Sequence, residues 1–328
     1  MSSIDIAVPC YQYGRYLPEC VASVLGQGIE DVRILIIDNA STDDSVMIAR
    51  KLAEQDARVQ VLARARNMGP HASFNAGVDW AAADYFMVLC ADDLLAPGAL
   101  RRASQVLDAN PDLSFAYGTD RHVVPDTPLP ELDSKVPVRW QLCSGKDFIR
   151  DRCRNPEHYI AAGMVLVRTS AQKQAGHYRP ELPHTDDFEM LLRLACHGGV
   201  AFTAAVLGFK RVHGANRTND YLVDRTTDLA ERMAAIDSFL AYEGRDMPEA
   251  AWLRRRARKS LAERAYWCGV KDLLLRRRTH RELFHFAFKL DASTRLLPPV
   301  GYFLRMDRSI RAILGDFMPH AVKSGTGN

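Results

Sequence analysis

Two adjacent aspartates, Asp92 and Asp93, follow an apolar, β-favouring stretch that begins at Tyr85. A strand that runs directly into polar residues is typical of a buried parallel strand, and ligands of open α/β sheets collect at such strand ends. Paired carboxylates suit a hard divalent cation and, through it, the phosphates of a nucleotide. The same pair could instead begin a turn or cap the helix expected over 97–107, so alone it leaves both interpretations open.

The preceding residues alternate between strand-like and helix-like patterns. Strands are predicted at 4–8, 32–37 and 59–62, and helices at 19–25, 46–54 and 71–82. This alternation predicts a mostly parallel, doubly wound sheet with right-handed crossovers. Polar or aromatic residues follow each strand, so several of them would converge at one sheet edge and could hold a nucleotide. Each of them taken singly could also be a turn, a cap or a surface aromatic.

Composition and missing motifs narrow the classes of function. The 328 residues are 47% hydrophobic and 25% charged, which predicts a globular protein with a sizeable core. Seven cysteines without a CxxC pair indicate reduced thiols in a cytoplasmic setting. We expect no secretory signal and no membrane span. Neither GxGxxG after the first strand nor GxxxxGK[ST] occurs, which argues against a dinucleotide or P-loop site.

The first hundred residues resemble the family 2 glycosyltransferases, a large inverting group with the GT-A fold. The matching stretches are VPCY at 8–11, SVLGQ at 23–27, IIDNASTD at 36–43, NMG at 67–69, NAG at 75–77 and LCADD at 89–93. Each stretch is weak by itself, but their order and spacing together are specific. The resemblance predicts an α/β fold of GT-A type. Such a fold has a single Rossmann-like, doubly wound, mostly parallel sheet, here with a C-terminal helical appendage.

The resemblance also implies roles for the strand-end residues. It places the nucleotide against Pro9, Tyr11, Asp38, Asn67 and Asp92, with Asp38 binding the base. Asp92 stands at the second acid of the family's DxD motif, so it is implied to coordinate Mn²⁺ or Mg²⁺ bridging the diphosphate, with Asp93 beside it as a second candidate ligand. The chain departs from the family pattern at Cys90, which replaces the first acid of that motif, at Gln12 and at Phe74, where arginine is frequent.

A second acid pair, Asp186 and Asp187, is predicted to begin a helix, whose N-terminus favours negative charge. The stretch resembles the family's Thr-Glu-Asp motif, whose second acid is the catalytic base. That role therefore falls on Asp187, with Asp186 as the next choice; a helix cap without chemistry is the alternative. An acceptor hydroxyl is a poor nucleophile until a carboxylate takes its proton. Because a helix N-terminus lowers a carboxylate's pKa, we expect a base active at neutral pH.

The segment from Phe209 to Asn216 follows another predicted strand, at 200–207. It resembles the family's Tyr-Arg-x-His segment, in which the histidine can approach the metal or the departing diphosphate. His213 is therefore a third candidate metal ligand. A structural histidine is the alternative.

From residue 221 the family pattern stops, and helices are predicted at 229–242, 248–275 and 279–290. Arginines dominate this region. A basic amphipathic surface could lie on an anionic membrane, pack on the sheet domain or form a homodimer contact. We expect three parts: a nucleotide-sugar-binding half at 1–95, a metal and acceptor half at 96–220, and a basic helical region at 221–328.

These observations predict an inverting, metal-dependent glycosyltransferase. Its donor would be a nucleotide-diphosphate sugar, with UDP the expected carrier, and its acceptor a sugar or lipid-linked hydroxyl in polysaccharide, glycolipid or glycoconjugate assembly. We expect a cytoplasmic location, with peripheral contact at the inner face of the membrane. One alternative is a catalytically degenerate sugar-nucleotide-binding module used in assembly. A nucleic-acid partner is not expected, because the arginine-rich region lacks interleaved stacking aromatics.

Overall fold

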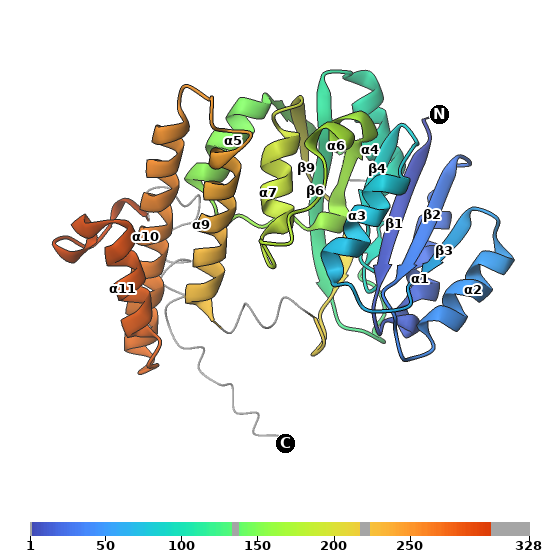
Figure 1. Cartoon of the computed structure of the whole chain (residues 1–328), viewed down its shortest axis with the longest axis horizontal. Coiled ribbons are helices and arrows are strands. Elements are labelled where there is room, and N and C mark those ends of the chain that lie inside the picture. Colours follow the sequence, from blue (N-terminus) through green and yellow to red (C-terminus); the bar gives the residue numbers. More distant parts are fainter. Residues whose placement is uncertain (1, 133–137, 217–223, 303–328) are drawn as a thin grey trace.

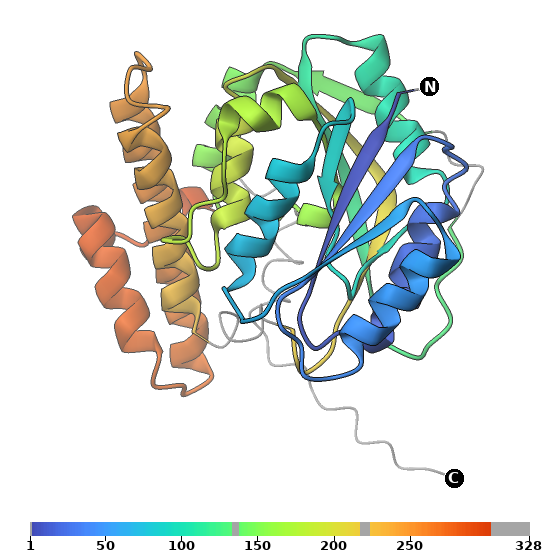
Figure 2. The same cartoon turned by 45° about the vertical axis from the view of Figure 1, so that its right-hand side comes forward.

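The computed structural model describes residues 2–132, 138–216 and 224–302. In this part of the chain one twisted sheet has helices on both faces, and the C-terminal helices stand as a further layer at one end (Figure 1). The turned view separates this helical layer from the sheet (Figure 2). The predicted boundary at 220/221 lies outside the described residues. The three-part division of the chain stays a prediction.

The first ninety residues form the parallel half of the sheet. Its strands are β1 (Ile4–Cys10), β2 (Val32–Asp38), β3 (Val59–Ala63) and β4 (Tyr85–Val88), which pair in parallel in the order β3-β2-β1-β4. The connecting helices are α1 (Leu17–Leu25), α2 (Ser45–Gln55) and α3 (Pro70–Trp80). All seven were predicted within a few residues. Strands β1, β2 and β4 are buried along nearly their whole length, which explains their continuous apolar runs.

Pro9 does not end the first strand as predicted, because β1 continues to Cys10. Beyond Ala7 the register with β4 stops, and β1 pairs only with β2. A proline is tolerated there, since the ladder on the β4 side no longer requires its missing N–H.

The second half of the sheet mixes strand directions. It comprises β5 (Leu94–Leu95), β6 (Leu113–Val123), β7 (Trp140–Cys143), β8 (Val165–Arg168) and β9 (Gly199–Arg211). Strand β8 runs antiparallel between β4 and β6, whereas β6 and β9 are parallel, and β5 and β7 pair antiparallel with β9. The apolar stretch at 160–168 reads as one strand, but only its end forms β8, because Ala162–Met164 forms a 3-10 turn.

Helices cover the two faces of this sheet. Helix α4 (Ala99–Ala109) shares one apolar cluster with α1 and α2, and α3 covers β1, β2 and β4 from the other face. Helices α5 (Gly145–Arg154), α6 (Thr169–Ala175) and α7 (Asp186–Leu194) share a further cluster with β6 and β8. Neither β6, β7 nor α5 was predicted from the sequence.

The C-terminal layer consists of α9 (Arg225–Ala241), α10 (Ala250–Leu274) and α11 (His280–Leu290). The apolar cluster that begins on α5 and α7 continues into all three helices through buried residues such as Phe239, Leu261 and Leu283. The apolar faces of α9 and α10 are therefore packed against α7 and α5, and α11 packs on α10. Among the described helices, none has the length and apolar character needed to cross a membrane.

Gly77 marks the closest approach of α3 to the sheet. A Cβ added at Gly77 would lie 2.5 Å from the Ala7 Cβ of β1. We expect Gly77→Ala to lower the free energy of unfolding by about 1–3 kcal/mol, because the core has no space for the methyl group. Urea denaturation measures this change. Gly301→Ala is the matched control, since no atom lies within 4 Å of its added Cβ. Equal losses in the two variants would contradict the close packing.

Candidate active site

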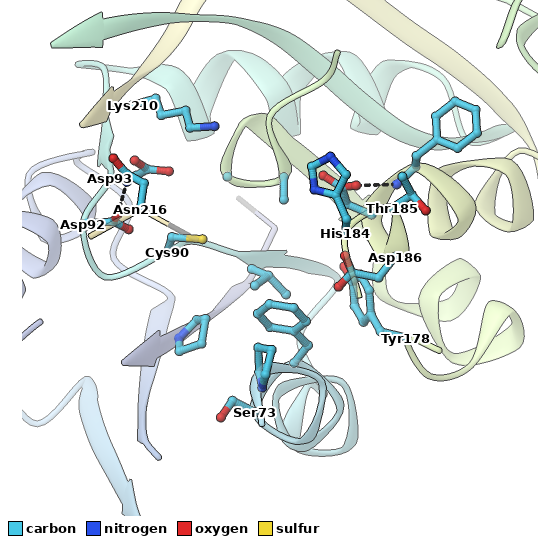
Figure 3. Close-up of a pocket in the computed structure, with 18 of the residues that line it drawn as sticks. Ser73, Cys90, Asp92, Asp93, Tyr178, His184, Thr185, Asp186, Lys210 and Asn216 are labelled. Carbon is cyan, nitrogen blue, oxygen red and sulfur yellow. Dashed lines mark hydrogen bonds between the residues drawn. The ribbon is translucent and has the colours of Figure 1, made fainter. Parts of the chain in front are cut away.

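The carboxyl ends of the parallel strands border a cavity of about 540 Å³. Most of the residues predicted from the sequence line it, namely Pro9, Tyr11, Asn67, Asp92, Asp93, Asp186 and Asp187. Figure 3 shows Cys90, Asp92 and Asp93 on one side and Thr185 and Asp186 on the other. Asp38 and His213 do not line the cavity, although each contacts or adjoins a residue that does.

The acid pair after β4 is buried, with Asp92 and Asp93 each only 6% exposed. Burial raises the pKa of Asp92, and burial together with the neighbouring Asp92 charge raises the pKa of Asp93 to about 8. The two side chains therefore lie close enough to disfavour simultaneous ionisation. Lys210 on β9 lowers the pKa of both carboxyls, but only in part.

Hydrogen bonds fix the orientation of this acid pair. The Asp92 Oδ2 accepts from Asn216 Nδ2 at 3.0 Å and lies 3.2 Å from His213 Nε2. The Asp93 Oδ1 accepts from the backbone N–H of Arg211 at 3.1 Å, and the Arg211 guanidinium donates to the Asp92 carbonyl at 3.0 Å. The end of strand β9 therefore fixes the positions of both acids.

The chemistry of this cluster fits a divalent cation. Ligand atoms of Cys90, Asp92 and Asp93 lie within 4.8 Å of one another, and among the described residues no other group of this kind meets the same distance. Mn²⁺ and Mg²⁺ prefer oxygen ligands, so Asp92 and Asp93 would hold the ion and Cys90 would contribute little. A bound cation would also relieve the repulsion that raises the two pKa values.

His213 occupies a supporting position behind Asp92. Its ring stacks on Tyr16 with 5.1 Å between centroids and meets the Tyr13 ring edge-on at 5.4 Å. The role of His213 as a metal ligand stays a prediction. Its contacts with Asp92 and Tyr16 are those of a side chain that orients the Asp92 carboxylate.

At the strand ends predicted to hold the nucleotide, the structure differs from the prediction in one detail. Asp38 is fully buried at the end of β2, where its Oδ2 accepts from the Ser41 N–H at 3.0 Å. Its Oδ1 has no hydrogen-bond partner among the described residues. The neighbouring Asn39 lines the cavity instead, and its amide donates to Asn67 Oδ1 at 2.8 Å.

The second acid pair begins α7, as predicted. Asp186 is buried, with its Oδ2 3.2 Å from His71 Nε2, whereas the half-buried Asp187 accepts from the Phe188 N–H at 2.6 Å. The expectation that the helix N-terminus would lower the base's pKa is wrong. Burial, followed by the charge of Asp186, outweighs that hydrogen bond and raises the pKa of Asp187 to about 6. A group with this pKa is still mostly ionised at neutral pH.

Several cavity residues were not predicted from the sequence. Three cationic side chains from three different elements line the cavity: Arg152 of α5, Lys210 of β9 and Arg232 of α9. Lys210 could have been found, because it lies in the segment from Phe209 to Asn216 that follows the predicted strand at 200–207. Arg152 and Arg232 carried no such signal, since each sits in a polar stretch whose arginines are expected to be solvent-exposed. Phe74, which replaces a family arginine, packs against Tyr178 at 5.4 Å between ring centroids.

The C-terminal layer reaches the cavity through one ionic cluster. Asp228 on α9 accepts from Arg232 Nε at 3.0 Å, and its Oδ1 lies 3.0 Å from His184 Nε2. Although burial opposes ionisation, contacts with His184 and Arg232 hold the pKa of Asp228 well below its usual range. His184 and Arg232 both line the cavity.

One acid pair lies at a strand end and the other begins a helix, and both line the same cavity beside a largely parallel sheet. This arrangement is that of a GT-A transferase. The chain belongs to the glycosyl transferase family 2, which matches residues 5–174. It is 31% identical over 213 residues to a chondroitin synthase of Pasteurella multocida, covering 65% of this chain and 21% of that protein. It is 35% identical over 92 residues to the glycosyltransferase GlyG of Streptococcus pneumoniae, covering 28% of this chain and 31% of that protein. The chain thus spans about a fifth of the length of the synthase it matches.

Solved structures share the fold. TarS 1–349 of S. aureus in complex with UDP-GlcNAc superposes with a TM-score of 0.57 at 14% identity, covering 90% of this chain and 92% of that chain. The mannosyltransferase PcManGT of Pyrobaculum calidifontis, in complex with GDP-Man and Mn²⁺, superposes with a TM-score of 0.55 at 15% identity. The match covers 91% of this chain and 88% of that chain. The α/β fold with C-terminal helices is therefore confirmed as GT-A.

The contact between His213 and Asp92 can be tested by Mn²⁺ binding. We expect His213→Phe to weaken Mn²⁺ binding about ten-fold or more, because the ring can still stack on Tyr16 but no longer orients the carboxylate. Electron paramagnetic resonance of free Mn²⁺, in the presence of UDP, measures the affinity. His197→Phe, at an exposed position after α7, is the control. An unchanged Mn²⁺ affinity in His213→Phe would contradict the orienting role.

Proposed function

We propose that this protein is an inverting glycosyltransferase that moves a sugar from a nucleotide-diphosphate donor to an acceptor hydroxyl. One observation carries the proposal: Asp92 and Asp93 face the same cavity of about 540 Å³ as Asp187. A cavity of this size suits a small-molecule ligand. Acids on two sides of one cavity support a reaction between a metal-bound diphosphate and a base-activated hydroxyl.

The donor would bind along the strand ends of the parallel half. Pro9, Tyr11 and Asn67 line the cavity and offer an aromatic surface and an amide for the nucleoside. Asp38 lies outside the cavity lining, next to Asn39, and would accept from the base once the nucleotide is bound. The unpaired Asp38 Oδ1 supports that role. UDP is the proposed carrier, consistent with the UDP-GlcNAc complex of TarS, whereas the GDP-Man complex of PcManGT makes GDP the next choice.

The transfer would be a single displacement. Asp187 takes the proton of the acceptor hydroxyl while that oxygen attacks C1 of the donor sugar, and the bond from C1 to the diphosphate oxygen breaks. Attack from the face opposite the diphosphate inverts the anomeric centre. A divalent cation, Mn²⁺ or Mg²⁺, held by Asp92 and Asp93 would supply charge neutralisation for the diphosphate.

The acceptor would be a sugar or a lipid-linked sugar in polysaccharide or glycoconjugate assembly. Leu296, Leu297 and Val300 are 84%, 75% and 65% exposed at the end of the described helical layer, and Arg295 precedes them. Such a basic and apolar edge supports peripheral contact with an anionic membrane at its cytoplasmic face. The homodimer contact has no comparable support in the described residues.

Calorimetric titration tests the donor site. We expect one of UDP, GDP and dTDP to bind in the presence of Mn²⁺, with binding at least ten-fold weaker without the metal, because the carboxylate pair cannot otherwise accept a diphosphate. Asp92→Ala should lose this binding. The exposed Asp79→Ala on α3 should retain it. If none of the three nucleotides binds with Mn²⁺ present, the protein is not the proposed transferase.

Release of UDP from a panel of UDP-sugars tests the base. We expect Asp187→Asn to keep nucleotide affinity but to lower kcat by about 10²- to 10⁴-fold. In the wild type, kcat should fall as pH drops through about 6, because protonation removes the base. Asp186→Asn serves as the comparison. A larger loss of kcat in Asp186→Asn than in Asp187→Asn would exchange the two roles. Full nucleotide binding without any turnover in the wild type would favour the catalytically degenerate module.

A further inference from the structure

A buried arginine on α5 lies at the cavity wall without an acidic partner. Arg152 is 2% exposed and lines the cavity. Its Nη2 donates to the carbonyl of His158, but its buried Nε and Nη1 have no hydrogen-bond partner among the described residues. Within the same residues it forms no ion pair, so three N–H donors lack a partner. The charges of Asp151 and Asp187 act on the guanidinium without a hydrogen bond to it.

This arrangement is costly for the folded protein. Burial lowers the pKa of Arg152 to about 10, so the guanidinium is still charged at neutral pH. Its central carbon lies 5.1 Å from the ring of Phe188 and 5.9 Å from that of Phe148, and such rings offset only part of the lost hydration. A buried charge without a partner would be replaced at little cost by an apolar side chain unless it binds something.

The position of Arg152 assigns it to the side of the cavity that holds Asp187. Phe188, which contacts its guanidinium, is the residue directly after Asp187. A second arginine, Arg232 on α9, lines the same cavity, and its charge acts on both Arg152 and Asp187. Asp92 and Asp93 enter the cavity from different elements, after β4.

We propose that Arg152 and Arg232 form a subsite for an oxyanion, a carboxylate or a phosphate, carried by the acceptor. The inference rests on the proposed function, because it places the acceptor next to Asp187. A guanidinium presents parallel N–H groups that match either oxyanion, and pairing would satisfy the buried Nε and Nη1 of Arg152. The acceptor would thus be an acidic sugar or a sugar phosphate rather than a neutral glycan.

Three probes of matched shape test this subsite: methyl glucoside, methyl glucuronide and methyl glucoside 6-phosphate. Each is titrated at fixed ionic strength into the full chain loaded with UDP and Mn²⁺. We expect at least one charged probe to bind ten-fold or more tightly than the neutral one, and the stronger of the two identifies carboxylate or phosphate. Equal affinity of all three in the wild type overturns the proposal without any variant.

Arg152→Met should remove the preference for the charged probe while leaving UDP affinity unchanged. It should also leave Tm equal or higher, because an apolar side chain replaces an unpaired buried charge, whereas a structural arginine would lower Tm on replacement. Arg154→Met, at an exposed position on the same helix, is the control and should change neither quantity. Arg152→Lys keeps the charge with fewer donors and should lose part of the preference.

Two other results have distinct meanings. If UDP does not bind the wild type with Mn²⁺, the proposed function fails and this inference fails with it; if UDP binds but the charged probe has no advantage, only the inference fails. A donor arm compares UDP-glucose with UDP-glucuronate in the absence of probes. A preference for UDP-glucuronate that Arg152→Met abolishes would assign the anion to the donor sugar and overturn the assignment to the acceptor.

Discussion

The site depends on the way Arg211 holds two neighbouring carboxylates. Asp92 and Asp93 repel each other in a buried position, and such a pair needs a fixed counter-charge and fixed donors. Arg211 supplies the donors, through its backbone N–H to the Asp93 carboxylate and its guanidinium to the main-chain carbonyl of Asp92. The neighbouring Lys210 supplies positive charge that acts on both carboxylates. The Arg211 guanidinium also pairs with Glu19 of α1. One buried side chain therefore joins the end of β9, the acid loop and the first helix, which are far apart in the sequence.

The cavity is closed by parts of the chain that the parallel sheet does not include. Strands β1 to β4 bring the nucleotide-side residues to one edge, but α5, α7 and α9 supply the opposite wall. Asp228 links α9 to this wall by binding both His184 and Arg232. The apolar cluster shared by α5, α7 and the C-terminal helices keeps these helices in register with the site. Packing energy in the helical layer thus maintains the geometry of the cavity.

Most of the parallel half of the fold was predictable because β1, β2 and β4 are buried on both faces and appear as continuous apolar runs. The acid pairs were predictable because they follow a strand or begin a helix. Strand β7 was missed since most of its residues are exposed, and α5 was missed because its buried Phe148 and Ile149 are flanked on both sides by charged residues. Arg152 and Arg232 could not be assigned, since nothing in a polar helical stretch distinguishes a buried arginine from a solvated one. The direction of the Asp187 pKa shift also required the structure, because burial and the helix N-terminus act in opposite senses.

The contribution of α9 to the cavity wall bears on how chains of this kind diversify. The residues proposed to bind the nucleotide belong to the first part of the chain, whereas Arg232 belongs to a helix beyond the segment that matches the family. Recombination that exchanges the helical layer would replace one wall of the cavity and leave the strand-end acids in place. New acceptor preferences could then arise in a lineage by exchange of the helical layer, without passing through variants that no longer bind the donor.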